Sequence, residues 1–153
     1  MDSTGAAMNN FIGPVDVTLL QPTGDGFYTA WTPNTGARWD AVNDSNPDED
    51  TTYISAAAVG TKNTFTHGTL PAASTAVKAT CVWARGRRDD GTTRAFKVLL
   101  RNTTPTDALG SVEHFVGANY IWFFQPYEVS PFTSAAFSVS EVNNIEFGCQ
   151  ITT

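Results

Sequence analysis

The amino-acid sequence predicts an all-β protein that folds as a single β-sandwich, with a jelly-roll or related Greek-key topology and long loops. Two observations predict this class. Apolar residues alternate with a period of two through much of the chain from Val15 to Ile151, and turn-forming residues interrupt them about every 8 to 12 positions. Threonine occurs 22 times against 3 lysines, so a β-branched residue that favours strands dominates the polar positions.

The 153 residues are predicted to form one sandwich domain at 11–153, preceded by a flexible N-terminal arm at 1–10. The arm is predicted because its residues are small and polar and lack periodicity. The first half of the domain is then predicted to contain strands at 15–19 and 27–31 around a turn at 21–26, a short strand at 38–42, a strand at 51–56 and a short edge piece at 62–68.

The second half contains the clearest hairpin pattern. A strand over 77–83, with Val77, Cys81 and Trp83 on one face, is predicted to pair with a strand at 96–100 across a turn at 86–91. Further strands are predicted at 109–116, 120–127 and 145–151, and a helical turn at 138–144. Ser138 followed by Glu141 three residues later is a typical helix-capping pair.

Both cysteines, Cys81 and Cys149, lie in alternating apolar segments. Their spacing matches no Cys-x-x-Cys motif, and free cysteine is among the most often buried residue types. We therefore predict that both are reduced thiols in the core.

The charge balance argues against two classes of partner. The formal net charge is −6, whereas proteins that bind nucleic acid or anionic membranes generally need a basic face. The longest apolar runs, such as 120–124, are far shorter than the roughly 20 residues that span a bilayer. The first basic residue is Arg38, so we also expect no Sec-type secretion signal.

Motifs for catalysis are missing from the sequence. It contains no nucleophile elbow, no phosphate-binding loop and no dinucleotide fingerprint, and His67 and His114 have no neighbours at zinc-ligand spacing. We predict no catalytic residue, no metal and no cofactor. A hydrolase with carboxylates contributed by separate strands stays open, although no particular pair stands out.

An acidic segment at 40–50 holds 5 of the 15 carboxylates, including Asp44, Asp48, Glu49 and Asp50. Its first positions resemble a calcium-binding loop, but Glu49 stands where that loop needs glycine and Ser55 where it needs a bidentate glutamate. We interpret the segment as a solvated or partner-facing loop.

Four of the nine basic residues lie within ten positions of the predicted hairpin: Arg85, Arg87, Arg88 and Arg94. Arginine is enriched at protein interfaces and its planar group pairs well with carboxylates. We predict that these arginines and the four carboxylates of the acidic segment contact partners, including a neighbouring copy of the chain. A solvated hairpin is the alternative.

Several aromatic residues suggest either a sugar-stacking platform or ordinary core packing: Trp31, Trp39, Trp122, Phe123 and Tyr127. A strand at 120–127 places Trp122 and Phe124 on one face and Phe123 on the other. Such a segment is expected to be covered on both faces.

The chain resembles the small β-sandwich structural proteins of tailed bacteriophages, the head decoration or cement proteins. The resemblance spans 48–148. It is carried by the segment Asp48-Glu49-Asp50-Thr51-Thr52-Tyr53-Ile54, by Phe65 and Leu70-Pro71 before the strand 77–85, by the turn 88–91, by Pro131-Phe132-Thr133, and by Val142-Asn143-Asn144-Ile145-Glu146-Phe147-Gly148. Thr133-Ser134 and Phe137 stand where these proteins have Thr-Gly and Trp.

The resemblance implies a non-enzymatic virion protein that binds and stabilises the shell of the major capsid protein. It also implies a homotrimer on the capsid surface, made in the host cytoplasm, and it implies no catalytic residue. Two alternatives stay open: a carbohydrate-binding β-sandwich module, and another virion component such as a tail or head–tail protein.

Overall fold

A computed structural model of the chain describes residues 15–153, so the predicted arm at 1–10 lies outside the described residues. In chain order the elements are β1 (Pro22–Thr29), β2 (Thr32–Pro33), the 3-10 helix η1 (Asp40–Val42), β3 (Ile54–Ser55), β4 (Lys62–His67), β5 (Thr80–Gly86), β6 (Arg94–Arg101), β7 (Asp107–Leu109), β8 (His114–Val116), β9 (Ile121–Tyr127), α1 (Val139–Asn144) and β10 (Glu146–Ile151). The described chain is therefore predominantly β, which confirms the predicted fold class. No helix within residues 15–153 is long and apolar enough to cross a membrane.

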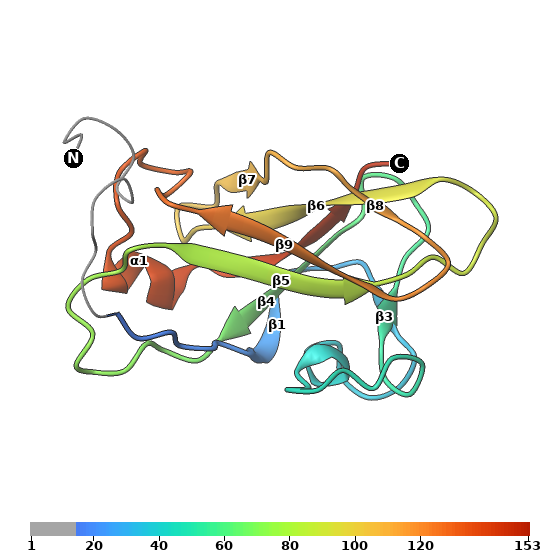
Figure 1. Ribbon diagram of the computed structural model, residues 1–153, viewed down its shortest axis with the longest axis horizontal. Helices are drawn as coiled ribbons and strands as arrows, with labels where there is room; N and C mark the ends of the chain where they lie inside the picture. Colours follow the sequence, from blue (N-terminus) through green and yellow to red (C-terminus); the bar gives the residue numbers. More distant parts are fainter. Residues whose placement is uncertain (1–14) are drawn as a thin grey trace.

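The strands form two main layers. The larger antiparallel sheet has the order β1–β4–β10–β6–β7, with β8 also paired to β6, and β5 and β9 form a separate antiparallel pair. Figure 1 shows this pair as a layer in front of the larger sheet. Phe96 of β6 packs against Phe123 of β9 with ring centroids 5.1 Å apart, so the two layers face one another as in a β-sandwich.

The core lies between these layers and is closed at one end by α1. Leu100, Phe137, Val142 and Ile145 form a buried cluster, and Val82 of β5 packs against it. β6 lies inside the larger sheet, between β10 on one side and β7 and β8 on the other, and most of its residues are buried. Apolar residues of both alternating positions of β6 are therefore buried.

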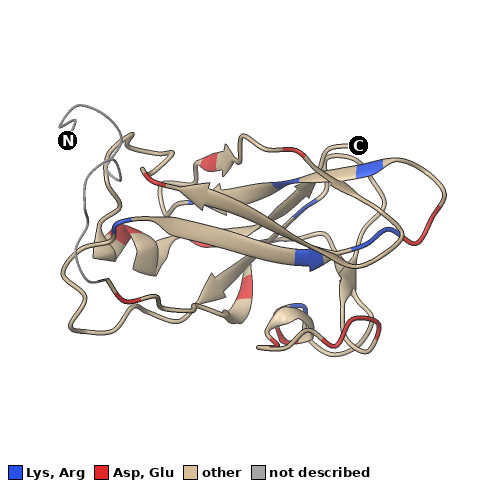
Figure 2. Cartoon of the chain, in the orientation of Figure 1, with Lys and Arg blue, Asp and Glu red and all other residues tan. Residues whose placement is uncertain are grey.

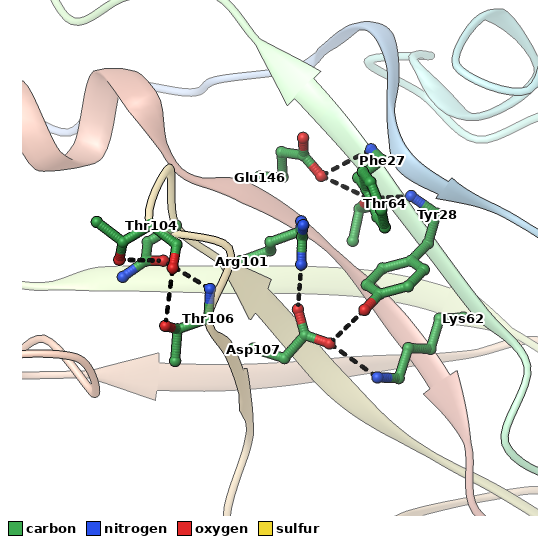
Figure 3. A network of polar contacts seen from close by, with 10 residues as sticks. Phe27, Tyr28, Lys62, Thr64, Arg101, Thr104, Thr106, Asp107 and Glu146 are labelled. Atoms are coloured by element: carbon green, nitrogen blue, oxygen red, sulfur yellow. Dashed lines mark hydrogen bonds and ion pairs between the residues drawn. The ribbon is translucent and has the colours of Figure 1, made fainter.

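The register of β1 against β4 shifts between Asp25 and Thr29, and residues 27 and 28 reach over the larger sheet to Glu146 and Asp107. Phe27 N donates a hydrogen bond to Glu146 (2.9 Å) and Tyr28 N donates to Thr64 Oγ1 (3.0 Å), as Figure 3 shows. Tyr28 then donates its hydroxyl to Asp107 Oδ2 (2.7 Å). Asp107 also accepts from Lys62 (2.8 Å) and from Arg101 (2.9 Å), so one carboxylate joins β1, β4, β6 and β7.

The predicted strand at 15–19 and turn at 21–26 are wrong. Val17 is 95% exposed, and the strand begins instead at Pro22, where no ladder N–H is needed. A Cβ on Gly24 would lie 2.8 Å from Thr66 Oγ1, and one on Gly26 would lie 2.5 Å from Thr64 Oγ1. These glycines permit a close approach of β4 rather than a turn.

Three further predictions in this half need correction. Residues 40–42 form η1 rather than a strand, because Asp25 accepts hydrogen bonds from Trp39 N (3.2 Å) and Arg38 (3.0 Å) and anchors the chain there. The strand predicted at 51–56 is reduced to β3. β4 is not an edge strand, since it lies between β1 and β10.

The predicted hairpin between 77–83 and 96–100 is also wrong. β5 pairs with β9, and β6 pairs with β10, so the two segments belong to different layers. Alternation shows which residues share a face of a strand, but it carries no information about the partner strand. The segment between β5 and β6 crosses from one layer to the other.

The predictions for the C-terminal part of the chain agree better with the structure. The strand predicted at 109–116 is divided into β7 and β8, and between them the side chain of Gln125 lies against Gly110 and accepts a hydrogen bond from Val112 N (3.2 Å). The strand at 120–127, the last strand and the helical turn are confirmed. Ser138 Oγ accepts from Glu141 N (3.0 Å), as the capping pair predicts.

Candidate functional site

The outer side of the β5–β9 pair carries a continuous aromatic surface, which we call the aromatic face. It consists of three cross-strand pairs: Cys81 with Pro126, Trp83 with Phe124, and Arg85 with Trp122. Residues directly opposite one another in an antiparallel pair point to the same side, so all six project outward.

The rings of the aromatic face are unusually exposed for their size. Trp83 is 61% exposed, Phe124 57% and Trp122 49%. Trp83 lies 5.7 Å from Phe124 and 6.1 Å from Trp122 between ring centroids, so the three rings support one another in a single patch. Monomeric proteins seldom leave large contiguous apolar patches in water unless the patch binds something.

The predicted facing of 120–127 is confirmed, because Phe123 is buried while Trp122 and Phe124 are exposed. The predicted set of sugar-stacking residues is not brought together. Phe123 and Tyr127 pack toward the core, and Trp31 donates its indole N–H toward Thr61 O (3.5 Å). Trp39 lies at the start of η1.

Trp83 is the functional candidate that the sequence reasoning missed, since it was assigned to the core with Cys81. In the structure the opposite face of β5 is the buried one, because Cys81 and Trp83 are exposed and Val82 packs against the core. Both faces of this strand carry apolar residues, so alternation alone did not identify the buried one.

At the C-terminal end of β5 the acidic segment meets the arginines within the same chain. We call Glu49, Asp50, Arg85, Arg87 and Tyr120 the ion-pair cluster. Arg85 pairs with Glu49, and Arg87 Nη2 lies 2.8 Å from Asp50 Oδ1. Tyr120 donates its hydroxyl to the same Asp50 oxygen (2.8 Å). Figure 2 shows the basic end of β5, while the remainder of the β5–β9 pair is uncharged.

The cluster is continuous with the aromatic face. The guanidinium carbon of Arg85 lies 5.5 Å from the centroid of the Trp122 ring and 5.8 Å from that of Tyr120. Arg87 lies 5.2 Å from the Tyr120 ring. Both arginines are therefore held by a carboxylate and by an aromatic ring, which limits their rotamers.

Hydrogen bonds from Arg87 and then from Tyr120 hold the pKa of Asp50 below its ordinary value. Burial, followed by the hydrogen bond to Asp50, raises the pKa of Tyr120. Asp50 thus stays ionised and Tyr120 protonated at neutral pH. The Arg87–Asp50 pair is open to solvent, so it orders the loop more than it stabilises the fold.

The remaining predicted contact residues lie outside the cluster. Arg88 donates to Thr92 O, and Arg94 Nη2 pairs with Asp90 Oδ2 at 2.7 Å. Asp44 and Asp48 both accept from the Thr52 hydroxyl, at 3.2 and 2.8 Å. Within residues 15–153 no group of three or more His, Cys, Asp or Glu side chains is arranged to hold a metal ion.

The two histidines lie in different surroundings, and Nε2 of His114 is buried without a hydrogen-bond partner among the described residues. His114 is buried against Phe96 and Phe123, with ring centroids 5.2 and 5.5 Å away, and burial lowers its pKa. His67 Nδ1 lies 2.6 Å from Gly68 O. Both positions fit a packing role.

The two cysteines differ, and the predicted burial of Cys81 is wrong. Both are free. Cys81 is exposed on the aromatic face, whereas Cys149 is half-buried, and burial raises the pKa of its thiol to about 12. We expect Ellman's reagent to label one thiol per native chain at mildly alkaline pH and a second thiol only after unfolding. The Cys81→Ser variant identifies the fast thiol, and rapid loss of both native thiols would contradict this assignment.

The site offers packed aromatic rings, arginines paired with carboxylates, and a shallow depression of about 430 Å³ lined by the ion-pair cluster with Ala118 and Asn119. These features suit recognition of another molecule.

No protein family, characterised protein or solved structure matches this chain in three separate comparisons.

Proposed function

We propose that the protein is a non-enzymatic structural component of a tailed-bacteriophage virion, a capsid decoration or cement protein that binds and stabilises the shell of the major capsid protein. The observation that carries the proposal is the aromatic face, an exposed patch on a supported sheet with a charged cluster at one end. The virion context of this proposal comes from the resemblance. The aromatic face provides the exposed surface through which the protein would bind the capsid shell.

The composition of this surface favours a protein partner. Trp, Phe, Tyr and Arg are enriched in protein interfaces and in the few residues that dominate binding energy. Arg85 and Arg87 already have carboxylate partners within the chain, so covering them does not bury an unpaired charge. The rings are held from beneath by the packed inner side of β5 and β9.

Self-association on the capsid surface belongs to the same proposal, with the homotrimer as the stoichiometry that the resemblance implies. The β5–β9 layer has only two strands, so each strand has an edge on which no further strand is paired within residues 15–153. Such edges invite pairing with another chain. A jelly-roll or Greek-key topology is the proposed finer description, supported by the position of the last strand between β4 and β6.

The test adds purified protein to particles that lack it and measures occupancy. We expect the double variant Trp83→Ser with Phe124→Ser to lower affinity at least about thirtyfold, because truncating central aromatic anchors typically costs about 2 kcal/mol or more. The matched control is Phe115→Ser, which removes an exposed ring on β8 of the other layer and should leave occupancy unchanged.

Normal occupancy of a folded double variant would remove the aromatic face from the interface. Failure of the wild-type protein to bind any particle would contradict the virion proposal itself. Light scattering on the same proteins shows whether the aromatic face also mediates self-association, since only the double variant should then become monomeric.

A further inference from the structure

A second hollow is lined by residues of α1 and by none of the ion-pair cluster. Figure 1 shows α1 at the end of the molecule opposite the C-terminal end of β5. The hollow is an open cleft of about 640 Å³. One wall is the loop from β6 to β7, with Asn102, Thr103 and Thr104. The other wall comes from the loop before α1 and from the helix itself. The aromatic face contributes no residue to this cleft.

Both walls are held in place by hydrogen bonds. Asn102 Oδ1 accepts from Thr104 Oγ1 (3.0 Å) and from Thr106 N (2.9 Å), and Figure 3 shows the two threonines of this loop. On the opposite side the fully buried Ser130 donates its hydroxyl to Glu141 Oε1 and accepts from Phe132 N (3.1 Å). The cleft is therefore pre-formed, which reduces the entropy lost when a ligand binds.

Several polar groups of these walls remain available for a ligand. Within residues 15–153 the hydroxyls of Thr103 and Ser140, the amide nitrogen of Asn102 and the second carboxylate oxygen of Glu141 make no hydrogen bond. Hydroxyls both donate and accept, an amide nitrogen donates and a carboxylate accepts. Together they offer a mixed set of donors and acceptors at the cleft surface.

The residues that line the cleft favour one chemical class of ligand. Among the described residues 15–153, no lysine or arginine lines the cleft, which disfavours a phosphate or other anion, and Glu141 is the one carboxylate in its lining. Neutral polyols present hydroxyls that match mixed donors and acceptors. Phe132, which packs against the core cluster on its other side, adds aromatic surface to the lining, and such surface suits the C–H groups of a sugar ring. We propose that this cleft binds a neutral saccharide, a function additional to and independent of the proposed capsid binding.

The test is an NMR titration of the labelled protein with neutral sugars: glucose, galactose, mannose, N-acetylglucosamine, maltotriose and chitotriose. We expect at least one of these sugars to shift the amide signals of Thr103, Thr104 and Ser140. The double variant Thr103→Val with Ser140→Ala removes two exposed hydroxyls with little change in volume. It should weaken that binding roughly tenfold, since each lost hydrogen bond contributes about a half-decade in affinity.

The control is Trp122→Ala, which alters the aromatic face and should leave sugar binding unchanged. The proposal fails if none of the six sugars shifts signals of the cleft. It also fails if the shifts map to β5 and β9 and disappear in Trp122→Ala, because the sugar would then bind the aromatic face. The cleft variant should still bind particles, so failure of this inference is distinguishable from failure of the capsid proposal.

Discussion

Replacing Gly148 with alanine is expected to destabilise the protein by about 3 kcal/mol or more, enough to unfold much of it. Gly148 lies in β10, between β4 and β6. A Cβ there would lie 1.8 Å from Asn63 O and 2.8 Å from Thr64 Cα. Both are backbone atoms of a central strand, so they cannot move away without breaking the pairing of β4 with β10.

The measurement is the midpoint of chemical denaturation, followed by circular dichroism. Gly117→Ala is the matched control, because a Cβ on Gly117 meets nothing within 4 Å. Its effect should stay within about 0.5 kcal/mol. Equal midpoints for the two variants would contradict the close approach of β4 to β10.

Replacing Asp107 with asparagine is expected to reduce stability at neutral pH by about 3 kcal/mol. The carboxylate accepts from Lys62, Tyr28 and Arg101, and Arg101 is a buried cation. The neutral amide offers one acceptor oxygen in place of two, and it leaves the positive charge of Arg101 without a counter-ion. Uncompensated buried charge is one of the larger penalties in folded proteins.

The same variant has a defined pH dependence. Burial raises the pKa of Asp107, but hydrogen bonds from Lys62, Tyr28 and Arg101 together outweigh burial, so its pKa in the folded protein lies below the ordinary 3.8. A carboxyl with a depressed pKa contributes stability that is present above its unfolded pKa and is lost as the pH falls through the folded value. The difference between wild type and Asp107→Asn should therefore narrow below about pH 4.

Denaturation midpoints measured from neutral to acidic pH test this expectation. Asp89→Asn is the control, because Asp89 is exposed and pairs with no cation within residues 15–153. Its midpoint should follow that of the wild type. A difference for Asp107→Asn that stays constant at all pH values would show that the charge of Asp107 contributes nothing.

Local signals predicted local structure well. The pair of Ser138 and Glu141 predicted the start of α1, because the hydrogen bond between them spans only three residues. The terminal strand was predicted from Phe147, Cys149 and Ile151, which share one face of β10. Signals of this kind depend on neighbours in sequence and need no knowledge of the rest of the fold.

Strand pairing was predicted poorly, for the opposite reason. β5 and β6 are close in sequence, yet their partners β9 and β10 lie far along the chain. The alternation of a strand is compatible with many partners, and the choice among them depends on how the whole core packs. The turn predicted at 21–26 is wrong for a related reason, because Gly24 and Gly26 permit close contact between strands.

The ion-pair cluster shows the same difference between what local sequence predicts and what depends on long-range contacts. Arg85, Arg87, Glu49 and Asp50 were selected by composition as two separate charged segments. These residues come together around Tyr120 through contacts between residues more than 30 positions apart in the sequence. Composition identifies such residue types but carries no information about which segments meet.

By itself, then, the sequence determined the all-β class, the last strand, the facing of the aromatic strand 120–127 and the capped turn before β10. Only the tertiary structure decided that Trp83 and Cys81 point to solvent and that the acidic segment closes on the arginines of its own chain. The physical reason is that periodicity shows which side chains share a face of a strand, but it does not show which of the two faces is buried. A face becomes the buried one only when another layer packs against it.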